Sequence, residues 1–164
     1  MAGVLQRGFA VNPNAWPTFE SALAEVEESF GEGRISLIAQ SAGKVLGWIG
    51  GIEHYDGHVY ELHPLVVDPL HQRRGIGTAL VKAFEREVRL RGAVTIWLGA
   101  DDEDGRTSLS GIDLYPDVLE KLGTIQNLNA HPYEFYLKNG YVIVGIIPDA
   151  NGYGKPDIYM AKRV

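Results

Sequence analysis

The fold of this chain is decided by the stretch Val66-Val67-Asp68-Pro69-Leu70-His71-Gln72-Arg73-Arg74-Gly75-Ile76-Gly77. The apolar run 58–67 that leads into it predicts a buried strand, which ends where Pro69 has no N–H to donate to a ladder. The residues that follow predict a helix over 78–91, because apolar positions recur there every four residues. These positions are Leu80, Phe84 and Val88. A strand, a turn that contains glycines and a helix therefore follow one another.

The turn between this strand and this helix favours an anion. Backbone N–H groups of Gly75-Ile76-Gly77 and the positive end of the helix converge on one point. The segment is not a dinucleotide fingerprint, since Leu80 replaces the third glycine, and it is not a Walker A loop, since no Gly-Lys-Ser/Thr follows. Arg73 and Arg74 add charged donors suited to phosphate. The turn predicts a pyrophosphate ester as ligand, although a glycine turn without a ligand is the alternative for such a motif taken alone.

Outward from this unit, periodicity predicts alternating strands and helices. The first fifteen residues show no sustained period and are expected to form a loop or a loosely attached strand. The predicted strands are 34–40, 44–52, 58–67, 94–98, 141–147 and 158–161. The predicted helices are 18–30, with the core stripe Phe19, Leu23, Val26 and Phe30, then 78–91, a short one after Pro116, and one that has Pro132 at its first position and is capped by Gly140. We expect a single domain over 1–164 of the α/β (α+β) class, with a mixed sheet and helices on its faces.

Composition excludes several classes of protein. The 164 residues include 15 Lys and Arg against 21 Asp and Glu, a net charge of −6, which argues against a nucleic-acid partner. There is no cysteine, so disulfides and thiolate zinc sites are excluded, and the five histidines lack metal-ligand spacing; we expect no metal. No apolar run is long enough to cross a membrane, and the first residues do not follow the plan of a signal peptide. We expect no membrane partner and a cytoplasmic location.

Two motifs resemble those of the GNAT acetyltransferase superfamily and follow one another in the order found there. The first is the turn 72–77 after Val66-Val67, which looks like the pyrophosphate loop for acetyl-CoA. The second is Phe135-Tyr136-x-x-x-Gly140-Tyr141, which is similar to the signature in which a helical tyrosine faces the cofactor sulfur. The resemblance implies a mostly antiparallel sheet whose two central strands splay apart, so that the pantetheine arm of acetyl-CoA inserts between them. The cofactor-binding residues it implies are Leu65, Val67, Gln72, Arg73, Arg74, Gly75, Ile76, Gly77, Thr78, Asn129 and Tyr136.

Within the superfamily, the chain resembles aminoglycoside 6′-N-acetyltransferases over residues 16–164. The segments that carry this resemblance are Trp16-Pro17, Glu61 to Val67, Leu98 to Asp102, Ile125 to Leu128, His131 to Tyr136 and Lys155 to Ile158. It implies an aminoglycoside substrate, a role in antibiotic resistance and a homodimer. The family usually has a first strand and more helix before the Trp-Pro pair, so the fifteen residues that precede Trp16 indicate a shortened first region and an incomplete wall of the substrate cleft.

The reaction implied is direct attack of an amine on the thioester, without a covalent enzyme intermediate. Glu61 is the candidate proton acceptor, the Leu65 N–H would polarise the thioester carbonyl, and Tyr136 would stabilise the departing thiolate as a hydrogen-bond donor. Strand alternation would place Glu61, His63, Leu65 and Val67 on one face unless a bulge intervenes. The candidate substrate-binding residues are Trp16, Glu61, His63, Asp101 and Asp104.

Each of these residues also has a structural interpretation. Glu61 is then a partly exposed strand carboxylate, His63 completes a core hydrogen bond, and the acidic run 101–104 is a solvated loop. Two other functions also stay open. One is a GNAT enzyme that acetylates another amine, such as a polyamine or a protein N-terminus; the other is a non-catalytic module that binds CoA or an aminoglycoside.

Overall fold

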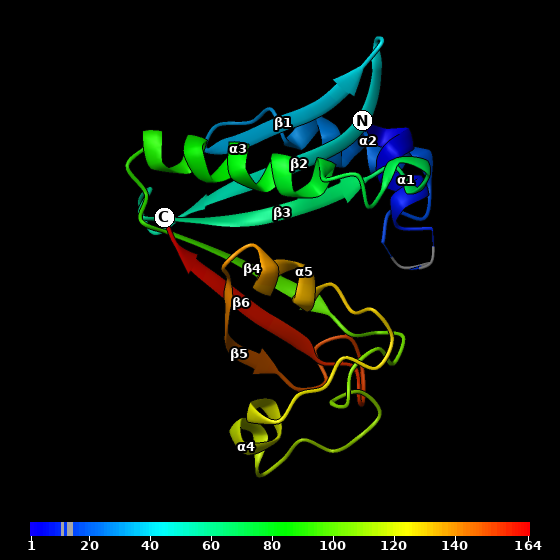
Figure 1. The fold of residues 1–164 in the computed structure, drawn as a ribbon, viewed down its shortest axis with the longest axis vertical. Coiled ribbons are helices and arrows are strands. Elements are labelled where there is room, and N and C mark those ends of the chain that lie inside the picture. The colour runs from blue at the N-terminus through cyan, green and yellow to red at the C-terminus, as the bar shows by residue number, and fades with distance from the viewer. Residues whose placement is uncertain (11, 13–14) are drawn as a thin grey trace. The chain divides into compact units, whose positions relative to one another are not determined.

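A computed structural model describes residues 1–10, 12 and 15–164 of the chain (Figure 1). The chain divides into two compact units, one formed by residues 1–96 with 163–164 and the other by residues 97–162. The helices are α1 (Ala2–Gly8), α2 (Phe19–Glu28), α3 (Ile76–Leu90), α4 (Val118–Gly123) and α5 (Tyr133–Lys138), with a short 3-10 helix at Pro69–His71. The strands are β1 (Arg34–Ser41), β2 (Lys44–His54), β3 (Val59–Val67), β4 (Thr95–Asp101), β5 (Val142–Ile147) and β6 (Asp157–Arg163). All six predicted strands are confirmed, and the strands and helices together form the mixed α/β fold that the sequence predicts.

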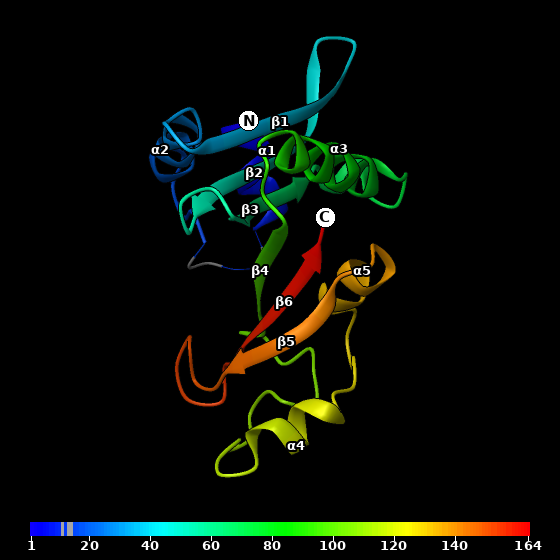
Figure 2. The same cartoon turned by 90° about the vertical axis from the view of Figure 1, so that its left-hand side faces the viewer.

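The first unit is an antiparallel sheet in the order β1-β2-β3, with helices on both faces. Figure 2 shows α3 on one side of these strands and α2 on the other. Helix α3 buries the predicted positions Leu80, Phe84 and Val88, which confirms that stripe. A Cβ on Gly51 of β2 would lie 2.3 Å from the Phe84 ring, so α3 packs closely on the sheet because this strand position has no side chain.

The start of the chain is a helix, so the expected loop or loose strand is wrong. Ala2, Val4 and Leu5 of α1 are buried in one apolar cluster with Trp48 and Val66 of the sheet. The helix has only seven residues, which is too short to be stable by propensity alone, so its burial against the sheet stabilises it. A local reading of the sequence cannot detect a contact of that kind.

Helix α2 begins as predicted but buries a different stripe. Thr18 caps it by accepting the N–H of Ser21, whose side chain in turn accepts the N–H of Thr18. Of the predicted core stripe only Val26 is buried, together with Ala22. Phe19, Leu23 and Phe30 are exposed, so the expected apolar face is displaced around the helix axis.

The second unit contains strands β4, β6 and β5 in that order, with the antiparallel pair β5–β6 at its edge. The short helix expected after Pro116 is α4, and it buries Leu122 against Leu109 and Leu114. Helix α5 begins one residue later than predicted, since Pro132 is its N-cap rather than its first residue. Gly140 has a φ of +85°, which terminates this helix as expected.

Candidate active site

The turn before α3 presents a row of unpartnered donors. Gly75 is the N-cap of α3 and has a φ of +81°, a backbone conformation that favours glycine. Among the described residues, none accepts a hydrogen bond from the backbone N–H groups of residues 73–78. Arg73 and Arg74 are exposed and form no ion pair within the described ranges. This geometry fits a pyrophosphate and agrees with the sequence prediction, because an anion there would meet backbone donors, a helix N-terminus and two guanidinium groups.

The last residues of β3 direct some of their backbone groups to the edge away from β2. The Asp68 N–H donates to the Leu46 carbonyl oxygen at 2.8 Å, so these two residues form a hydrogen-bonded pair of the β2–β3 ladder. Hydrogen-bonded and non-hydrogen-bonded pairs alternate along an antiparallel ladder. The N–H and C=O groups of Leu65 and Val67 therefore point away from β2, where an extended ligand can pair with them. The Gln72 side chain donates to the Val67 carbonyl oxygen at 3.2 Å and links the turn to this edge.

Asp68 connects this edge to the start of the chain. Its carboxylate accepts two hydrogen bonds from the Arg7 guanidinium, at 2.6 and 3.1 Å, and one from the Leu70 N–H at 3.1 Å. The hydrogen bonds from Arg7 lower the pKa of the Asp68 carboxyl below its ordinary value. Helix α1 thus holds the residue from which the pyrophosphate turn departs.

A bulge in β3 overturns the expected single face for its four candidate residues. The pairing register shifts between Ile49 and Gly51 of β2, so that Leu65 lies opposite Ile49 whereas Glu61 lies opposite Ile52. Because 49 and 52 differ by an odd number on β2, these two partners point to opposite faces of the sheet. The Leu65 side chain therefore faces α3 and the Glu61 side chain faces α1 and α2. The expected role of Leu65 depends on its main chain and is unaffected.

We call the sheet face toward α1 and α2 the Glu61 face, and it carries two pairs of histidine and glutamate. The His54 Nε2 lies 3.0 Å from Glu61 Oε2. The His63 Nε2 lies 3.8 Å from Glu25 Oε1 on α2. Trp16 covers this second pair, since its indole N–H donates to Glu25 Oε2 at 3.2 Å and its ring centroid is 5.7 Å from that of His63. Three of the predicted substrate-binding residues, Trp16, Glu61 and His63, thus share one face of the first unit.

In the second unit, Tyr136 lies on α5 among other aromatic rings. Its ring centroid is 5.2 Å from that of Phe135 and 5.7 Å from that of Tyr141. Burial raises the pKa of the Tyr136 hydroxyl above the ordinary value for tyrosine. The group is therefore protonated at neutral pH and can act as a hydrogen-bond donor.

His131 is a structural residue that positions the start of α5. Its Nδ1 accepts the Tyr133 N–H at 3.2 Å, so its Nε2 carries the proton and donates to the Asp101 carbonyl oxygen at 3.0 Å. Burial lowers the pKa of this imidazole, which is therefore neutral at pH 7. Asn127 supports the same turn with two hydrogen bonds to the His131 backbone. The predicted cofactor residue Asn129 is exposed nearby, and its N–H donates to the Arg106 carbonyl oxygen.

In the acidic run 101–104, three carboxylates accept hydrogen bonds from other groups of the protein. Asp102 is fully buried and accepts the N–H groups of Arg106 and Thr107 at 2.7 and 2.8 Å. Asp104 Oδ2 accepts a hydrogen bond from Arg106 Nε at 2.8 Å and forms an ion pair with Arg106 Nη2 at 2.7 Å. Asp101, which is the last residue of β4 rather than part of a loop, accepts the Asn151 amide. The structure thus places the two predicted amine binders Asp101 and Asp104 on the surface, each with a protein partner.

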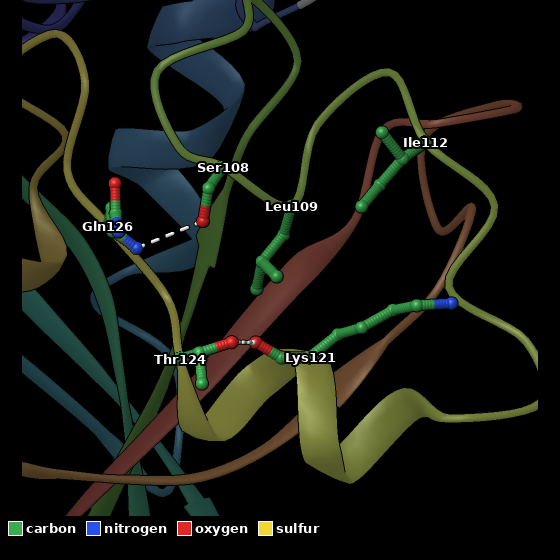
Figure 3. A pocket seen from close by; sticks show the side chains of 6 residues that line it. All are labelled: Ser108, Leu109, Ile112, Lys121, Thr124 and Gln126. Carbon is green, nitrogen blue, oxygen red and sulfur yellow. Dashed lines mark hydrogen bonds between the residues drawn. The ribbon is translucent and has the colours of Figure 1, made fainter.

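A surface pocket of the second unit is separate from all of these residues (Figure 3). Its lining comes from the segment 108–126, and none of the predicted site residues belongs to it.

Among the described residues there is no group of three or more His, Asp or Glu side chains arranged to hold a metal ion. In that same part of the chain, no helix combines the length and the apolar character needed to cross a bilayer.

The acetyltransferase (GNAT) family model matches residues 7–110, which include the β3 edge, the pyrophosphate turn and α3. The chain belongs to the GNAT acetyltransferase family. Members of this family transfer an acetyl group from acetyl-CoA, and the unpartnered donors of residues 73–78 are where this GNAT chain would hold the pyrophosphate of that molecule. The protein is thus an acetyl-CoA-dependent N-acetyltransferase, and the predicted cofactor is confirmed.

Solved structures of other GNAT enzymes are similar over almost the whole chain. A crystal structure of aminoglycoside 6′-N-acetyltransferase complexed with coenzyme A is 45% identical, with a TM-score of 0.89 over 99% of this chain and 89% of that one. The aminoglycoside 6′-N-acetyltransferase from Enterococcus faecium is 45% identical, with a TM-score of 0.88 and the same coverage. An aminoglycoside 6′-acetyltransferase type Ii is 38% identical, with a TM-score of 0.73 over 99% of this chain and 86% of that one. No curated protein sequence matches this chain significantly.

Sequence reasoning did not identify three residues that shape these sites: Glu25, His54 and the buried Asp102. Glu25 gave no signal, because one glutamate on a helix rich in glutamates looks like any other. His54 and Glu61 are separated by seven residues, and the pair is recognisable once a hairpin between β2 and β3 is assumed. Asp102 carried a weak signal, since an aspartate that precedes a glycine turn often accepts backbone N–H groups.

Proposed function

We propose that this GNAT enzyme is an aminoglycoside 6′-N-acetyltransferase, which transfers the acetyl group of acetyl-CoA to the 6′-amine of an aminoglycoside. The observation that carries the proposal is the 45% identity over 99% of the chain to two enzymes of that name. The Glu61 face supports it, because Glu25 lies beside the flat indole of Trp16 and a second carboxylate, Glu61, lies on the same face. Carboxylates attract a polycationic amino sugar, and an indole ring covers the apolar face of a sugar.

The first unit would orient the reactants and accept a proton. When bound, acetyl-CoA supplies a thioester whose carbonyl carbon is open to attack by an amine. The Glu61 carboxylate accepts one proton from the substrate ammonium, directly or through one water, and the free amine so formed attacks the carbonyl carbon. The Leu65 N–H points away from β2 and donates to the carbonyl oxygen as negative charge develops on it.

In the second unit, the proposed role of Tyr136 is to donate a hydrogen bond to the sulfur as the C–S bond breaks. Since burial raises the pKa of this hydroxyl above that of a free tyrosine, full proton transfer from it to a thiolate is uphill. The donor therefore stabilises the thiolate, and the proton that CoA finally takes up comes from the more acidic ammonium of the tetrahedral intermediate. The proposal also includes Asp101 and Asp104 as weaker contacts to substrate amines.

The experiment is a transfer assay that detects free CoA with a thiol reagent. The chain contains no cysteine, so the enzyme itself contributes no background signal. Purified protein is incubated with acetyl-CoA and kanamycin, then with a related drug that carries a hydroxyl instead of the 6′-amine. We expect CoA release with the first drug and little with the second, and a G75E variant, which puts bulk and negative charge at the anion site, should release none.

Two results would redirect the proposal. If spermidine or a peptide N-terminus is a better substrate than any 6′-amino drug, the protein is a GNAT enzyme for another amine. If no drug yields CoA although acetyl-CoA binds, the aminoglycoside assignment is wrong. A role in resistance, a homodimeric state and a cytoplasmic location belong to the same proposal, and drug susceptibility of an expressing strain, light scattering and cell fractionation test them.

A further inference from the structure

We propose that His54 is a positioning residue for Glu61, and this inference rests on the proposed function of Glu61 as proton acceptor. His54 is the last residue of β2, and its Nε2 lies 3.0 Å from Glu61 Oε2 on β3. In the β2–β3 register Glu61 lies opposite Ile52, so His54 is its diagonal neighbour on the Glu61 face. Within the described residues, no other side chain is at hydrogen-bond distance from the Glu61 carboxylate.

The direction of this hydrogen bond follows from its chemistry. An ionised carboxylate accepts hydrogen bonds and cannot donate one, so the proton lies on His54 Nε2. The bond is charge-assisted even when the imidazole is neutral, because the acceptor is ionised. His54 therefore acts on Glu61 as a fixed donor.

The consequence is that the two oxygens of Glu61 are no longer equivalent. Oε2 is occupied by His54, and Oε1 is left for the substrate amine or a bridging water. A glutamate side chain has three rotatable bonds, and both groups are partly exposed, at 22% for Glu61 and 38% for His54, so packing alone does not fix the carboxylate. The donor reduces this freedom and holds Oε1 in one orientation toward the amine.

The other pair on this face shows that proximity of a histidine to a glutamate is not enough. His63 lies on the same strand as Glu61, but its Nε2 approaches Glu25 at 3.8 Å, beyond hydrogen-bond distance. It also lies against the Trp16 ring. Only His54 has the distance that fixes the carboxylate proposed to react.

The test compares a variant that keeps a donor with one that removes it. H54Q retains a side-chain N–H, whereas H54L has none. We expect kcat of H54L to fall about 10- to 150-fold, the effect of losing one hydrogen bond to a charged group, while KM for acetyl-CoA is unchanged. H54Q should stay within about 2-fold of the parent enzyme, because amide and imidazole N–H groups donate comparably to a carboxylate. His58, an exposed residue of the turn between β2 and β3, provides matched controls in H58L and H58Q, for which kcat should not change.

A double-mutant cycle with E61Q separates positioning from a structural role. If His54 acts through Glu61, H54L should lower kcat in the parent enzyme and have no further effect in the E61Q background. The inference is overturned if kcat of H54L equals that of the parent, if H54L has the same effect in both backgrounds, or if H54Q is as slow as H54L. These results are distinguishable from failure of the proposed function. If E61Q alone were fully active, Glu61 would not be the proton acceptor, whatever the effect of His54. If another amine proves to be the substrate, the cycle is run with that amine and tests His54 equally well.

Discussion

The carboxylates of the Glu61 face and those of the acidic run 101–104 have opposite uses. On the Glu61 face, Glu61 interacts with an imidazole and Glu25 with an indole N–H, and neither pairs with a lysine or an arginine among the described residues. In the acidic run, Asp102 serves two backbone N–H groups and Asp104 is neutralised by Arg106. Asp102 and Asp104 are therefore less available to a cation than the two glutamates, although they lie in a denser run of acids. Whether a carboxylate is available to a cationic ligand depends on its partner in the fold, and the number of acidic residues in a segment does not predict it.

Removing the proposed base, Glu61, should have the largest effect on activity. E61Q keeps the size of the side chain but cannot accept a proton, so kcat/KM for an aminoglycoside should fall about 10²- to 10⁴-fold. Binding of acetyl-CoA, measured by calorimetry, should be unchanged, because Glu61 lies on the face opposite the Leu65 side chain and contributes nothing to the pyrophosphate turn. Steady-state kinetics at saturating acetyl-CoA checks the effect. A kcat/KM within about 3-fold of the parent would show that Glu61 is not the base.

In the acidic run, Asp102 is expected to contribute to the stability of the fold. In D102A the buried N–H of Thr107 and the part-buried N–H of Arg106 both lose their acceptor. We expect the free energy of unfolding to fall by about 2–3 kcal/mol, the cost of unsatisfied buried donors. For a chain of this length this lowers Tm by roughly 5–10 °C.

The matched control for D102A is D104A, two residues away. Asp104 pairs with Arg106 at the surface, and exposed ion pairs contribute about 0–1 kcal/mol. Its Tm should therefore change by a small fraction of the D102A effect. Equal losses in the two variants would mean that Asp102 and Asp104 act as one electrostatic unit rather than in different roles.

On the Glu61 face, Glu25 is expected to contribute to substrate binding rather than to the chemical step. E25Q preserves an oxygen that can accept the Trp16 indole N–H, so the fold around α2 should persist, and what is lost is one negative charge. We expect KM for a drug with several amines to rise about 3- to 10-fold, or about 0.7–1.4 kcal/mol, with little change in kcat. Kinetics with two drugs of different charge checks this: the increase should be larger for the more highly charged drug. A fall in kcat with KM unchanged would contradict a binding role.

The parts of the fold and site that could be predicted from sequence are those fixed by local chemistry. The turn 72–77 and the helix after it were recognisable, since glycine, arginine and a four-residue period act within a few positions. The opposite facing of Glu61 and Leu65 was not predictable, because the bulge is a property of the register between two strands. Helix α1 was missed because it is stabilised by tertiary packing on Trp48 rather than by its own residues.

The acidic run shows the same limit in the candidate site. Composition indicates that the four residues 101–104 carry negative charge, but their partners, the Arg106 and Thr107 N–H groups and the Asn151 amide, are set by how the chain returns on itself. Asn151 is separated from Asp101 by fifty residues, a contact that no local pattern encodes. The sequence therefore shows that these residues are acidic, but it does not predict whether their carboxylates are available to a ligand.

The smallest expected effect is that of D104N. Removing this charge leaves the Arg106 guanidinium, whose side chain is 27% exposed, without the carboxylate of its ion pair. The local net charge becomes more positive by one unit at a surface position, where solvent and salt screen it. KM for an aminoglycoside should rise by less than about 2-fold at 0.15 M salt and by somewhat more at low salt, since screening weakens as the Debye length grows. Kinetics at two ionic strengths checks this; a rise of 10-fold or more at physiological salt would show that the substrate displaces Arg106 and contacts Asp104 directly.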